Sequence, residues 1–299
     1  MDFDPRDSAD PRERDESIYG PRSRDHVRDR DSLDRDEDTR DHDPRDPFVR
    51  SVDLPCGMER ELVQDARERL YELNGDDSRM LATVGAFRVV AEGDLERFRD
   101  AENSLEHLRE EGLIRTVSVG HDQEACVLTD AGWDVLDSHR REAEGDARQE
   151  FHAGVSRRRE LQHDSQLFHA YLEVEQDLRG KGGRVERVVL EVDLKREYQE
   201  FLQQHNKGRK DSDGRPDREQ HEIADWARQH ELPYFDDQVH FPDFRIEYEL
   251  DGLDRHEDVE VITEHYRGGH AASRARAGFT CVGSKGRGGR PFSPRDWEW

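Results

Sequence analysis

The first fifty residues most constrain what this chain can fold into, because they contain almost nothing apolar to bury. The segment DPRDSADPRERDESIYGPRSRDHVRDRDSLDRDEDTRDHDPRDP consists mainly of Asp, Arg and Pro. Such a segment cannot offset the conformational entropy lost on ordering, so we expect a disordered charged tail over residues 1–52. We expect a second, short tail at residues 291–299. Folding is left to residues 53–290, enough chain for about two domains.

The whole chain is strongly acidic, with 72 Asp and Glu residues against 47 Lys and Arg and a net charge of −25. Only five of the basic residues are Lys. A dense carboxylate surface suits a salt-rich cytoplasm, where the repulsion is screened, so we expect a halophilic source. A high-GC genome would also favour Arg over Lys. The acidity disfavours nonspecific coating of DNA but permits binding through a local basic patch.

Cysteine usage and hydropathy indicate the compartment. Cys56, Cys126 and Cys281 are odd in number, far apart and without metal-ligand spacing, which indicates reduced thiols. The N-terminus MDFDPRDSADPRERD lacks the apolar region of a signal peptide. No stretch approaches the roughly 18 apolar residues of a membrane span. We therefore expect a soluble, cytoplasmic protein with no membrane partner.

Residues 58–140 carry the apolar pattern of a small helical domain with a β-hairpin. Helical periodicity predicts helices in MERELVQDARERLYELN, DDSRMLATVGAFRVV, GDLERF and AENSLEHLREEGLI. Asn74-Gly75 is expected to end the first of these helices, and Gly112 the last. RTVSVGHDQEACVLTD predicts two strands around a turn, and AGWDVLDSHRR predicts a final helix.

The stretch SLEHLREEGLIRTVSV…ACVLTDAGWDVL resembles the core of winged helix-turn-helix domains. The resemblance covers a recognition helix with its Gly-Leu-Ile stop, the wing hairpin, and a Leu-Thr-x-x-Gly start of the last helix. It implies a winged helix-turn-helix domain at residues 53–141, whose recognition helix enters the major groove of DNA. The candidate DNA contacts are Asn103 and His107 to base edges and Arg97, Arg99, Arg109 and Arg115 to phosphates.

Acidic residues in the same domain keep another use open. The wing tip GHDQE has two acids and no Lys or Arg. Glu102 and Glu106 lie on the expected recognition helix itself. A winged helix used for protein contacts or dimerisation is therefore an alternative to DNA binding, since a fold does not fix a function.

Residues 142–290 alternate helices and strands in the manner of an α/β domain. We expect residues 141–180 to be largely helical. We expect shorter helices in KREYQEFLQ, REQHEIADWARQH and HYRGGHAASRARAGF, and strands in RVERVVLEVDL, FRIEYEL, VEVIT and TCVG. KGRKDSDGRPD is expected to be a loop because of its Gly, Pro and Asp content.

A pair of acids in the last hairpin carries a candidate metal site. Nucleases of the PD-(D/E)xK type place Pro-Asp on one strand and Glu-x-Lys on the next, and their carboxylates hold Mg²⁺. Pro242-Asp243 and Glu260 match this pattern, so the resemblance makes Asp243 and Glu260 the candidate catalytic and metal-binding residues, with Glu264 as a further acid. The Lys position holds Ile262, which can neither donate to phosphate nor activate water. Mg²⁺ is expected only if this domain is active, and DNA binding is expected to require no cofactor.

Basic residues gather near the C-terminus of this acidic chain. Arg267, Arg274 and Arg276 lie on an expected helix, and SKGRGGR follows it. A Gly-rich basic loop beside a basic helix suits phosphate contacts. Internal pairing with the surplus acids is equally open.

The winged helix, His163-Asp164 on a helix, the Pro-Asp strand and the Glu-bearing strand together resemble the replication-relaxation family of plasmids and other mobile elements. That resemblance implies an α+β chain, with the winged helix followed by a degenerate restriction-endonuclease-like domain at residues 142–290. It implies a DNA-binding protein involved in replication or relaxation of element DNA. Its implied partners are double-stranded DNA and replication or mobilisation proteins, with a homodimer as a further option.

Two other functions stay open. One is an active Mg²⁺-dependent endonuclease that uses Asp243 and Glu260. The other is a winged-helix transcriptional regulator whose α/β domain senses a ligand or oligomerises.

Overall fold

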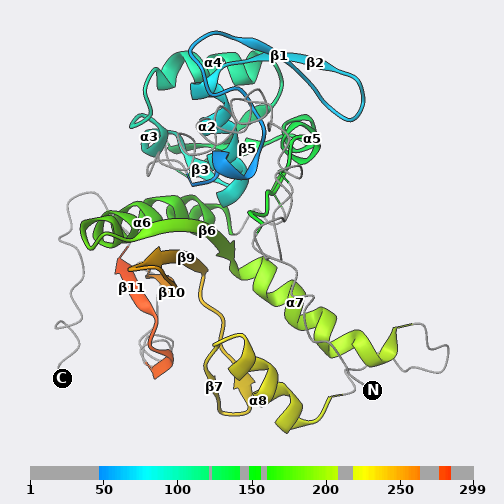
Figure 1. Ribbon diagram of the computed structural model, residues 1–299, viewed down its shortest axis with the longest axis vertical. Coiled ribbons are helices and arrows are strands. Elements are labelled where there is room, and N and C mark those ends of the chain that lie inside the picture. Colours follow the sequence, from blue (N-terminus) through cyan, green and yellow to red (C-terminus); the bar gives the residue numbers. More distant parts are fainter. Residues whose placement is uncertain are drawn as a thin grey trace, which may run out of the picture. The chain divides into compact units, whose positions relative to one another are not determined.

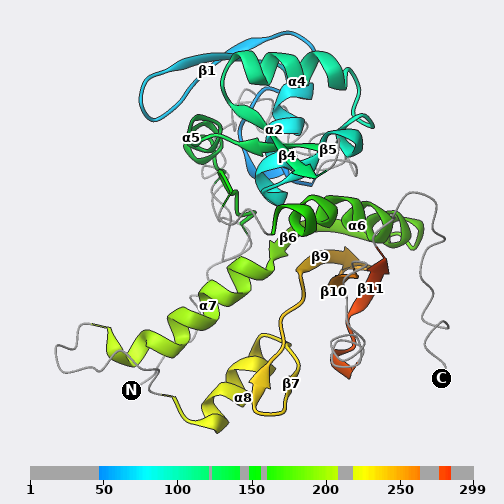
Figure 2. The same ribbon diagram turned by 180° about the vertical axis from the view of Figure 1, so that it is seen from behind.

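The computed structural model describes residues 47–120, 123–141, 148–155, 160–207, 218–262 and 276–283, all within the unit Pro44–Trp299 (Figures 1 and 2). Several expectations fall outside these ranges: the charged tail up to residue 46, most of the helix at 265–279, Glu264, Arg267, Arg274, SKGRGGR and residues 291–299.

Residues 58–74 contain an antiparallel hairpin, so the helix expected there is wrong. Strand β1 (Glu61–Gln64) pairs with β2 (Leu70–Leu73), and Val63, Tyr71 and Leu73 are buried. The buried side chains follow the two-residue period of strands. The helical spacing was carried partly by leucines that the structure leaves exposed.

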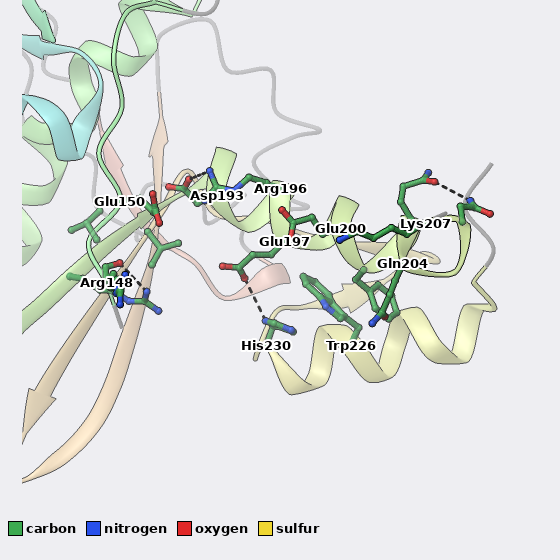
Figure 3. A pocket seen from close by; sticks show the side chains of 16 residues that line it. Arg148, Glu150, Asp193, Arg196, Glu197, Glu200, Gln204, Lys207, Trp226 and His230 are labelled. Carbon is green, nitrogen blue, oxygen red and sulfur yellow. Dashed lines mark hydrogen bonds and ion pairs between the residues drawn. The ribbon is translucent and has the colours of Figure 1, made fainter. Parts of the chain in front are cut away.

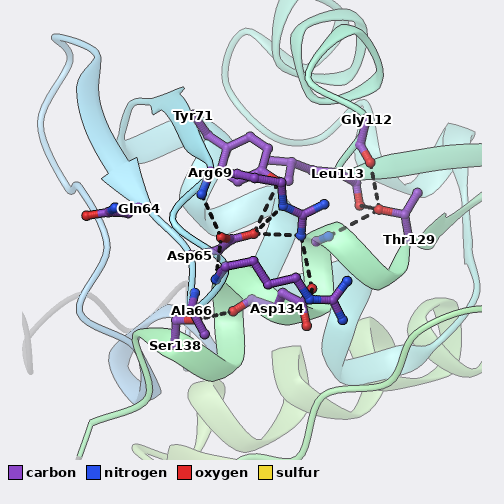
Figure 4. A network of polar contacts seen from close by, with 12 residues as sticks. Gln64, Asp65, Ala66, Arg69, Tyr71, Gly112, Leu113, Thr129, Asp134 and Ser138 are labelled. Carbon is purple, nitrogen blue, oxygen red and sulfur yellow. Dashed lines mark hydrogen bonds and ion pairs between the residues drawn. The ribbon is translucent and has the colours of Figure 1, made fainter.

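Asp65 holds the turn of this hairpin (Figure 4). Its carboxylate accepts hydrogen bonds from the backbone N–H groups of Arg67 at 2.8 Å and Arg69 at 3.0 Å, and from the Arg69 side chain at 2.7 Å. Burial favours the neutral acid, but these hydrogen bonds outweigh it and lower the pKa of Asp65. Both arginines also pair with Asp134 of helix α5 (Asp130–Ser138), at 3.2 and 3.0 Å. A hairpin alone is marginally stable, so these contacts fix it in place.

Three helices follow the hairpin as predicted: α2 (Gly75–Phe87), α3 (Glu92–Leu95) and α4 (Ala101–Glu110). Asn74 begins α2 instead of ending a helix. Its side chain accepts from the Asp77 N–H at 2.9 Å, and the Asp77 carboxylate accepts from the Asn74 N–H at 3.2 Å. This reciprocal cap satisfies two backbone donors that the first turn of a helix leaves open.

A three-stranded antiparallel sheet packs beside these helices in the order β3-β5-β4. The predicted hairpin is confirmed as β4 (Ile114–Gly120) and β5 (Gln123–Leu128), and the predicted last helix as α5. The short strand β3 (Val90–Ala91) pairs with β5 and was not predicted.

The Leu-Thr-x-x-Gly segment holds the start of α5 against the turn that follows α4 (Figure 4). Thr129 caps the helix by accepting from the Gly132 N–H at 3.1 Å, and its hydroxyl lies 2.6 Å from the Gly112 carbonyl oxygen. A Cβ on Gly132 would lie 2.2 Å from the Leu113 carbonyl oxygen. Only glycine fits this close approach of a helix to a backbone carbonyl.

A four-stranded sheet in the order β11-β10-β9-β6 forms the second half of the described chain. Strands β6 (Arg184–Leu190), β9 (Phe244–Leu250) and β10 (Leu253–Ile262) are antiparallel neighbours, and β11 (Thr280–Gly283) runs parallel to β10. All four strands were predicted, but β6 ends at Leu190, because residues 191–194 of the predicted strand form the first turn of a helix. Strand β10 is longer than expected because the turn before it is only Asp251-Gly252.

The long helix α6 (Leu161–Gly180) packs on this sheet and on the first half of the chain. The expectation placed more of residues 141–180 in helix, whereas residues 148–155 are not helical. A single cluster of buried side chains joins both halves. Phe87 of α2 lies 5.1 Å from both Phe168 and Tyr171 of α6 and 6.4 Å from Phe244 of β9, measured between ring centroids. The two domains expected on either side of the boundary at residues 141/142 therefore share one hydrophobic core.

An insertion between β6 and β9 has its own small core. It comprises α7 (Glu191–Gln203), the 3-10 helix η2 (Gln204–Asn206), α8 (Gln220–Gln229), β7 (Tyr234–Phe235) and β8 (Gln238–Val239). Both helices were predicted, and the two short strands were not. Arg245 ties the insertion to the sheet because it pairs with Asp258 at 2.7 Å and donates to the carbonyl oxygen of His230 at 2.9 Å.

A side chain forms hydrogen bonds with the outer edge of β6. The amide of Gln149, which is buried, donates to the Val188 carbonyl oxygen and accepts from the Val188 N–H, each at 2.9 Å. One residue of the edge strand is thus paired as it would be by another strand.

The fold is mixed α+β, in agreement with the class expected from the sequence. None of the helices found in the described ranges combines the length and apolar character needed to cross a membrane.

Candidate functional site

The structure brings the two predicted acids side by side. Asp243 directly precedes β9, and the register of β9 with β10 places Phe244 opposite Val259. Continuing this antiparallel register by one residue sets Asp243 beside Glu260. The expectation placed both acids on adjacent strands, whereas Glu260 lies in β10 and Asp243 is the residue just before β9.

Asp243 is engaged in internal contacts. Its Oδ2 accepts from the Val261 N–H at 2.7 Å and lies 3.2 Å from Nε2 of His163 on α6. The side chain is only 11% exposed. These contacts fix the carboxylate between the first turn of α6 and strand β10, and they use one of its two oxygens.

His163 lies between two carboxylates. Its Nδ1 is 3.6 Å from Asp164, and its Nε2 faces Asp243. Burial alone would lower the pKa of His163, but the two acids outweigh this and raise the pKa to about 10. Arg88, at the end of α2, lies 3.8 Å from the other oxygen of Asp164. His163 is thus the cationic neighbour of Asp243, and Arg88 is a cationic neighbour of Asp164.

The remaining groups do not complete a magnesium site among the described residues. Glu260 is 2% exposed, and Ile262 follows on the same strand. No three His, Cys, Asp or Glu side chains in the described part of the chain converge as metal ligands. Mg²⁺ requires close to octahedral oxygen coordination, usually including carboxylates open to water and substrate.

The exposed surface of α4 is acidic. Glu102, Glu106 and Glu110 are all exposed and are spaced four residues apart, so they form one stripe along the helix. Asn103 is exposed and donates to Asp100 at 2.5 Å. A helix presenting this stripe would repel phosphates along its length.

Two of the predicted DNA contacts on α4 are engaged within the protein. His107 Nε2 lies 2.6 Å from the carbonyl oxygen of Glu72. Arg109 pairs with Glu92 of α3 and donates to Thr116 of β4 at 3.0 Å. Arg109 therefore ties α4 to its neighbours, which sequence reasoning could not show.

The other predicted arginines are placed differently. Arg97 and Arg99 are exposed just before α4, and Arg115 is exposed at the start of β4. Arg276 pairs with Asp236 at 3.0 Å and stacks over the Phe235 ring at 4.3 Å, so internal pairing holds for this member of the basic stripe. Glu264, Arg267 and Arg274 lie outside the described residues.

A pocket that the sequence did not indicate lies along one face of α7 (Figure 3). Its volume is about 1240 Å³. Trp226 and Phe201 line it beside charges of both signs, and these charges are partly paired: Arg196 lies 3.1 Å from Asp193. The nearly balanced charge gives no preference for an anionic or a cationic ligand.

Comparison with known proteins does not extend this picture. No family model matches the chain, and neither a curated protein nor a solved structure matches it.

Proposed function

We propose that this chain is a DNA-binding protein of a plasmid or other mobile element, in which a winged helix docks on duplex DNA. The four-stranded sheet would be nuclease-like in arrangement and would serve as a scaffold without cleaving DNA. The observation that supports a sheet without cleavage is the engagement of Asp243, whose Oδ2 contacts the Val261 N–H and His163.

The order of elements supports the winged-helix part of this proposal. Helices α2, α3 and α4 are followed by the hairpin β4–β5 and then α5, and β3 completes the small sheet. Winged helix-turn-helix domains have this order, with the third helix as the reading helix. The resemblance to the replication-relaxation family is consistent with this order of elements.

The charge distribution limits how DNA can approach. Arg97, Arg99 and Arg115 are exposed near the two ends of α4, whereas the middle of α4 shows its acidic stripe. Phosphate contacts at the arginines would position the duplex without requiring a close approach of the whole helix. Binding should therefore depend on a few phosphate contacts.

The sheet supports the nuclease-like part. Helix α6, three antiparallel strands and a fourth strand parallel to the third are the core elements of restriction-endonuclease-like domains, and Asp243 and Glu260 lie at adjacent positions. His163 and the Val261 N–H both contact Oδ2 of Asp243, so this oxygen is already used within the protein. We therefore assign the sheet a role in positioning DNA or a protein partner.

Salt-dependent DNA binding tests the winged-helix assignment. Each phosphate contact contributes about −0.9 to the slope of log K against log salt, so three arginines contribute about −3. Replacing Arg97, Arg99 and Arg115 with Ala should weaken binding and reduce the slope by about that amount. The matched change of Glu102 and Glu106 to Gln should strengthen binding. Unchanged affinity in both variants would contradict docking through α4 and the wing.

Because the two acids are adjacent, an active nuclease is a second candidate function. One gel experiment distinguishes DNA cleavage from DNA binding without cleavage. Supercoiled plasmid would be incubated with the protein and Mg²⁺ or Mn²⁺ at several KCl concentrations, then treated with protease. We expect the plasmid to stay supercoiled while untreated samples show retarded DNA. Nicked or linear product that disappears with Asp243→Ala would establish an active metal site instead.

A further inference from the structure

A second pocket is lined by residues from both halves of the described chain, and its volume is about 620 Å³. The first half contributes residues 91–94 and the first two residues of β5, and the second half contributes α6 and the ends of β10 and β11. Small-molecule sites are typically clefts of about 300–1,000 Å³ with an apolar lining and a few polar groups. The pocket therefore has the size expected of a site for a small organic ligand.

Part of the lining is apolar. Ala170 of α6 lines the pocket together with Val261 and Val282, which are partners in the parallel pairing of β10 with β11. All three residues belong to the hydrophobic core that joins the two halves, so this apolar base of the pocket continues the core. An apolar ligand chain that lies on the base leaves water, and each buried methylene strengthens binding by about fourfold.

Another part of the lining carries three carboxylates, those of Glu92, Asp94 and Glu124. Oε1 of Glu92 lies 3.7 Å from Sγ of Cys126, which is two residues beyond Glu124 and therefore on the same face of β5. Glu92 pairs with Arg109, whereas Glu124 is exposed and has no ion pair within the described part of the chain. A carboxylate near a second carboxylate is stabilised by a cation, so Glu124 favours a cationic ligand.

Hydrogen-bond acceptors also outnumber fixed cations in this pocket. Asp94 lies 2.9 Å from Nδ1 of His169, and no Lys or Arg is found among the described lining residues. Gln166 lines the pocket as well, and its Oε1 is buried and accepts no hydrogen bond from any described residue. A buried acceptor is costly unless a donor reaches it. The lining therefore suits a positively charged donor, and it disfavours carboxylates and phosphates.

We propose that this pocket binds a small organic cation, a protonated primary amine carried on an apolar chain. Glu124 is the counter-ion of the ammonium group, Gln166 supplies a further acceptor, and the chain lies on the apolar base. The ligand then touches β5 as well as α6 and the four-stranded sheet, so it links the two halves of the described chain. None of these contacts involves DNA, so the amine site and the DNA-binding proposal are tested separately.

An NMR titration of the full chain with 1-aminohexane tests the site, with Ala and Val methyl groups labelled. In 1 M KCl the screening length is about 3 Å, so nonspecific attraction to a chain of net charge −25 is suppressed. The methyl signals of Ala170, Val261 and Val282 should shift saturably, whereas that of Val192 on α7 should not. 1-Aminobutane should bind more weakly, by about fourfold for each methylene removed. Hexanoate has the opposite charge and should cause no shift at these methyl groups.

Two variants test the polar contacts, and a third is their matched control. Glu124→Gln should weaken 1-aminohexane binding about fivefold, and Gln166→Leu by a similar factor. Glu110→Gln removes the same charge from an exposed position on α4 and should bind the amine like the unaltered protein.

Three results would overturn the proposal. The first is the absence of a saturable shift at the three methyl groups of the apolar base. The second is an equal shift with ammonium chloride or hexanoate, because the pocket would then not select an amine on an apolar chain. The third is an equal loss of binding in Glu124→Gln and Glu110→Gln, because the amine would then bind to acidic surface in general. The first two use the unaltered protein, so they do not depend on the folding of any variant.

Discussion

Replacing Gly132 with Ala should destabilise the junction between α4 and α5 more than its size suggests. The added methyl would lie 2.2 Å from the Leu113 carbonyl oxygen, about 1 Å inside normal contact. Relief requires α5 to move away from the α4 turn, which also strains the Thr129 cap and its contact with the Gly112 carbonyl oxygen. Overpacking of this kind costs about 1–3 kcal/mol and loss of the cap about 1 kcal/mol, so we expect about 3 kcal/mol.

Urea unfolding followed by circular dichroism measures this change, with Gly93→Ala as the control. Gly93 also lies in the first turn of a helix, but a Cβ there meets nothing within 4 Å. Alanine has the higher helix propensity, so Gly93→Ala should be neutral or stabilising by up to about 1 kcal/mol. Equal effects of the two substitutions would show that the close approach of Gly132 to Leu113 does not constrain the fold.

Three further predictions concern single contacts. The pKa of His163 is raised from 6.5 to about 10, so its contribution to stability is complete below pH 6.5 and is lost as pH rises toward 10. Because the side chain is about one-third exposed, we expect about 1–2 kcal/mol, and His163→Gln should flatten unfolding free energy over this pH range. Arg245→Ala should cost about 3 kcal/mol because the Asp258 carboxylate, 11% exposed, keeps only His256 at 4.0 Å, while Arg245→Met with Asp258→Leu should cost less in the same denaturation assay. Asn74→Ala should lower the thermal midpoint by an amount equivalent to about 1 kcal/mol, and Asn74→Ser should largely preserve it.

Local signals were read correctly from the sequence where packing agreed with them. The α4 helix, its Gly112 stop and the β4–β5 hairpin are encoded by neighbouring residues, and Gly112 has the positive φ of 71° that its position requires. Residues 58–74 show the opposite case. Leucines at helical spacing favoured a helix, but burial of Tyr71 and Leu73 against distant residues selected a strand, and tertiary contacts override weak local preference.

The sequence could predict the acids of the candidate site but not their contacts. The Pro-Asp and Glu motifs identified Asp243 and Glu260, and the strand pattern brought them together. The contact between His163 and Asp243 joins residues 80 positions apart, and the pairing of Arg109 with Glu92 likewise depends on packing between elements. Neither residue spacing nor composition reports which arginine is exposed and which is paired.

The glutamine beside β6 has a consequence for how this sheet ends. An edge strand presents donors and acceptors to any extended chain, and unprotected edges promote aggregation. At Val188 both groups are already taken by the Gln149 amide, so an incoming strand would have to displace a buried side chain before it could add a rung. Growth of the sheet by a further strand is therefore disfavoured at the middle of β6, because the strand could not pair with Val188 while Gln149 stays in place.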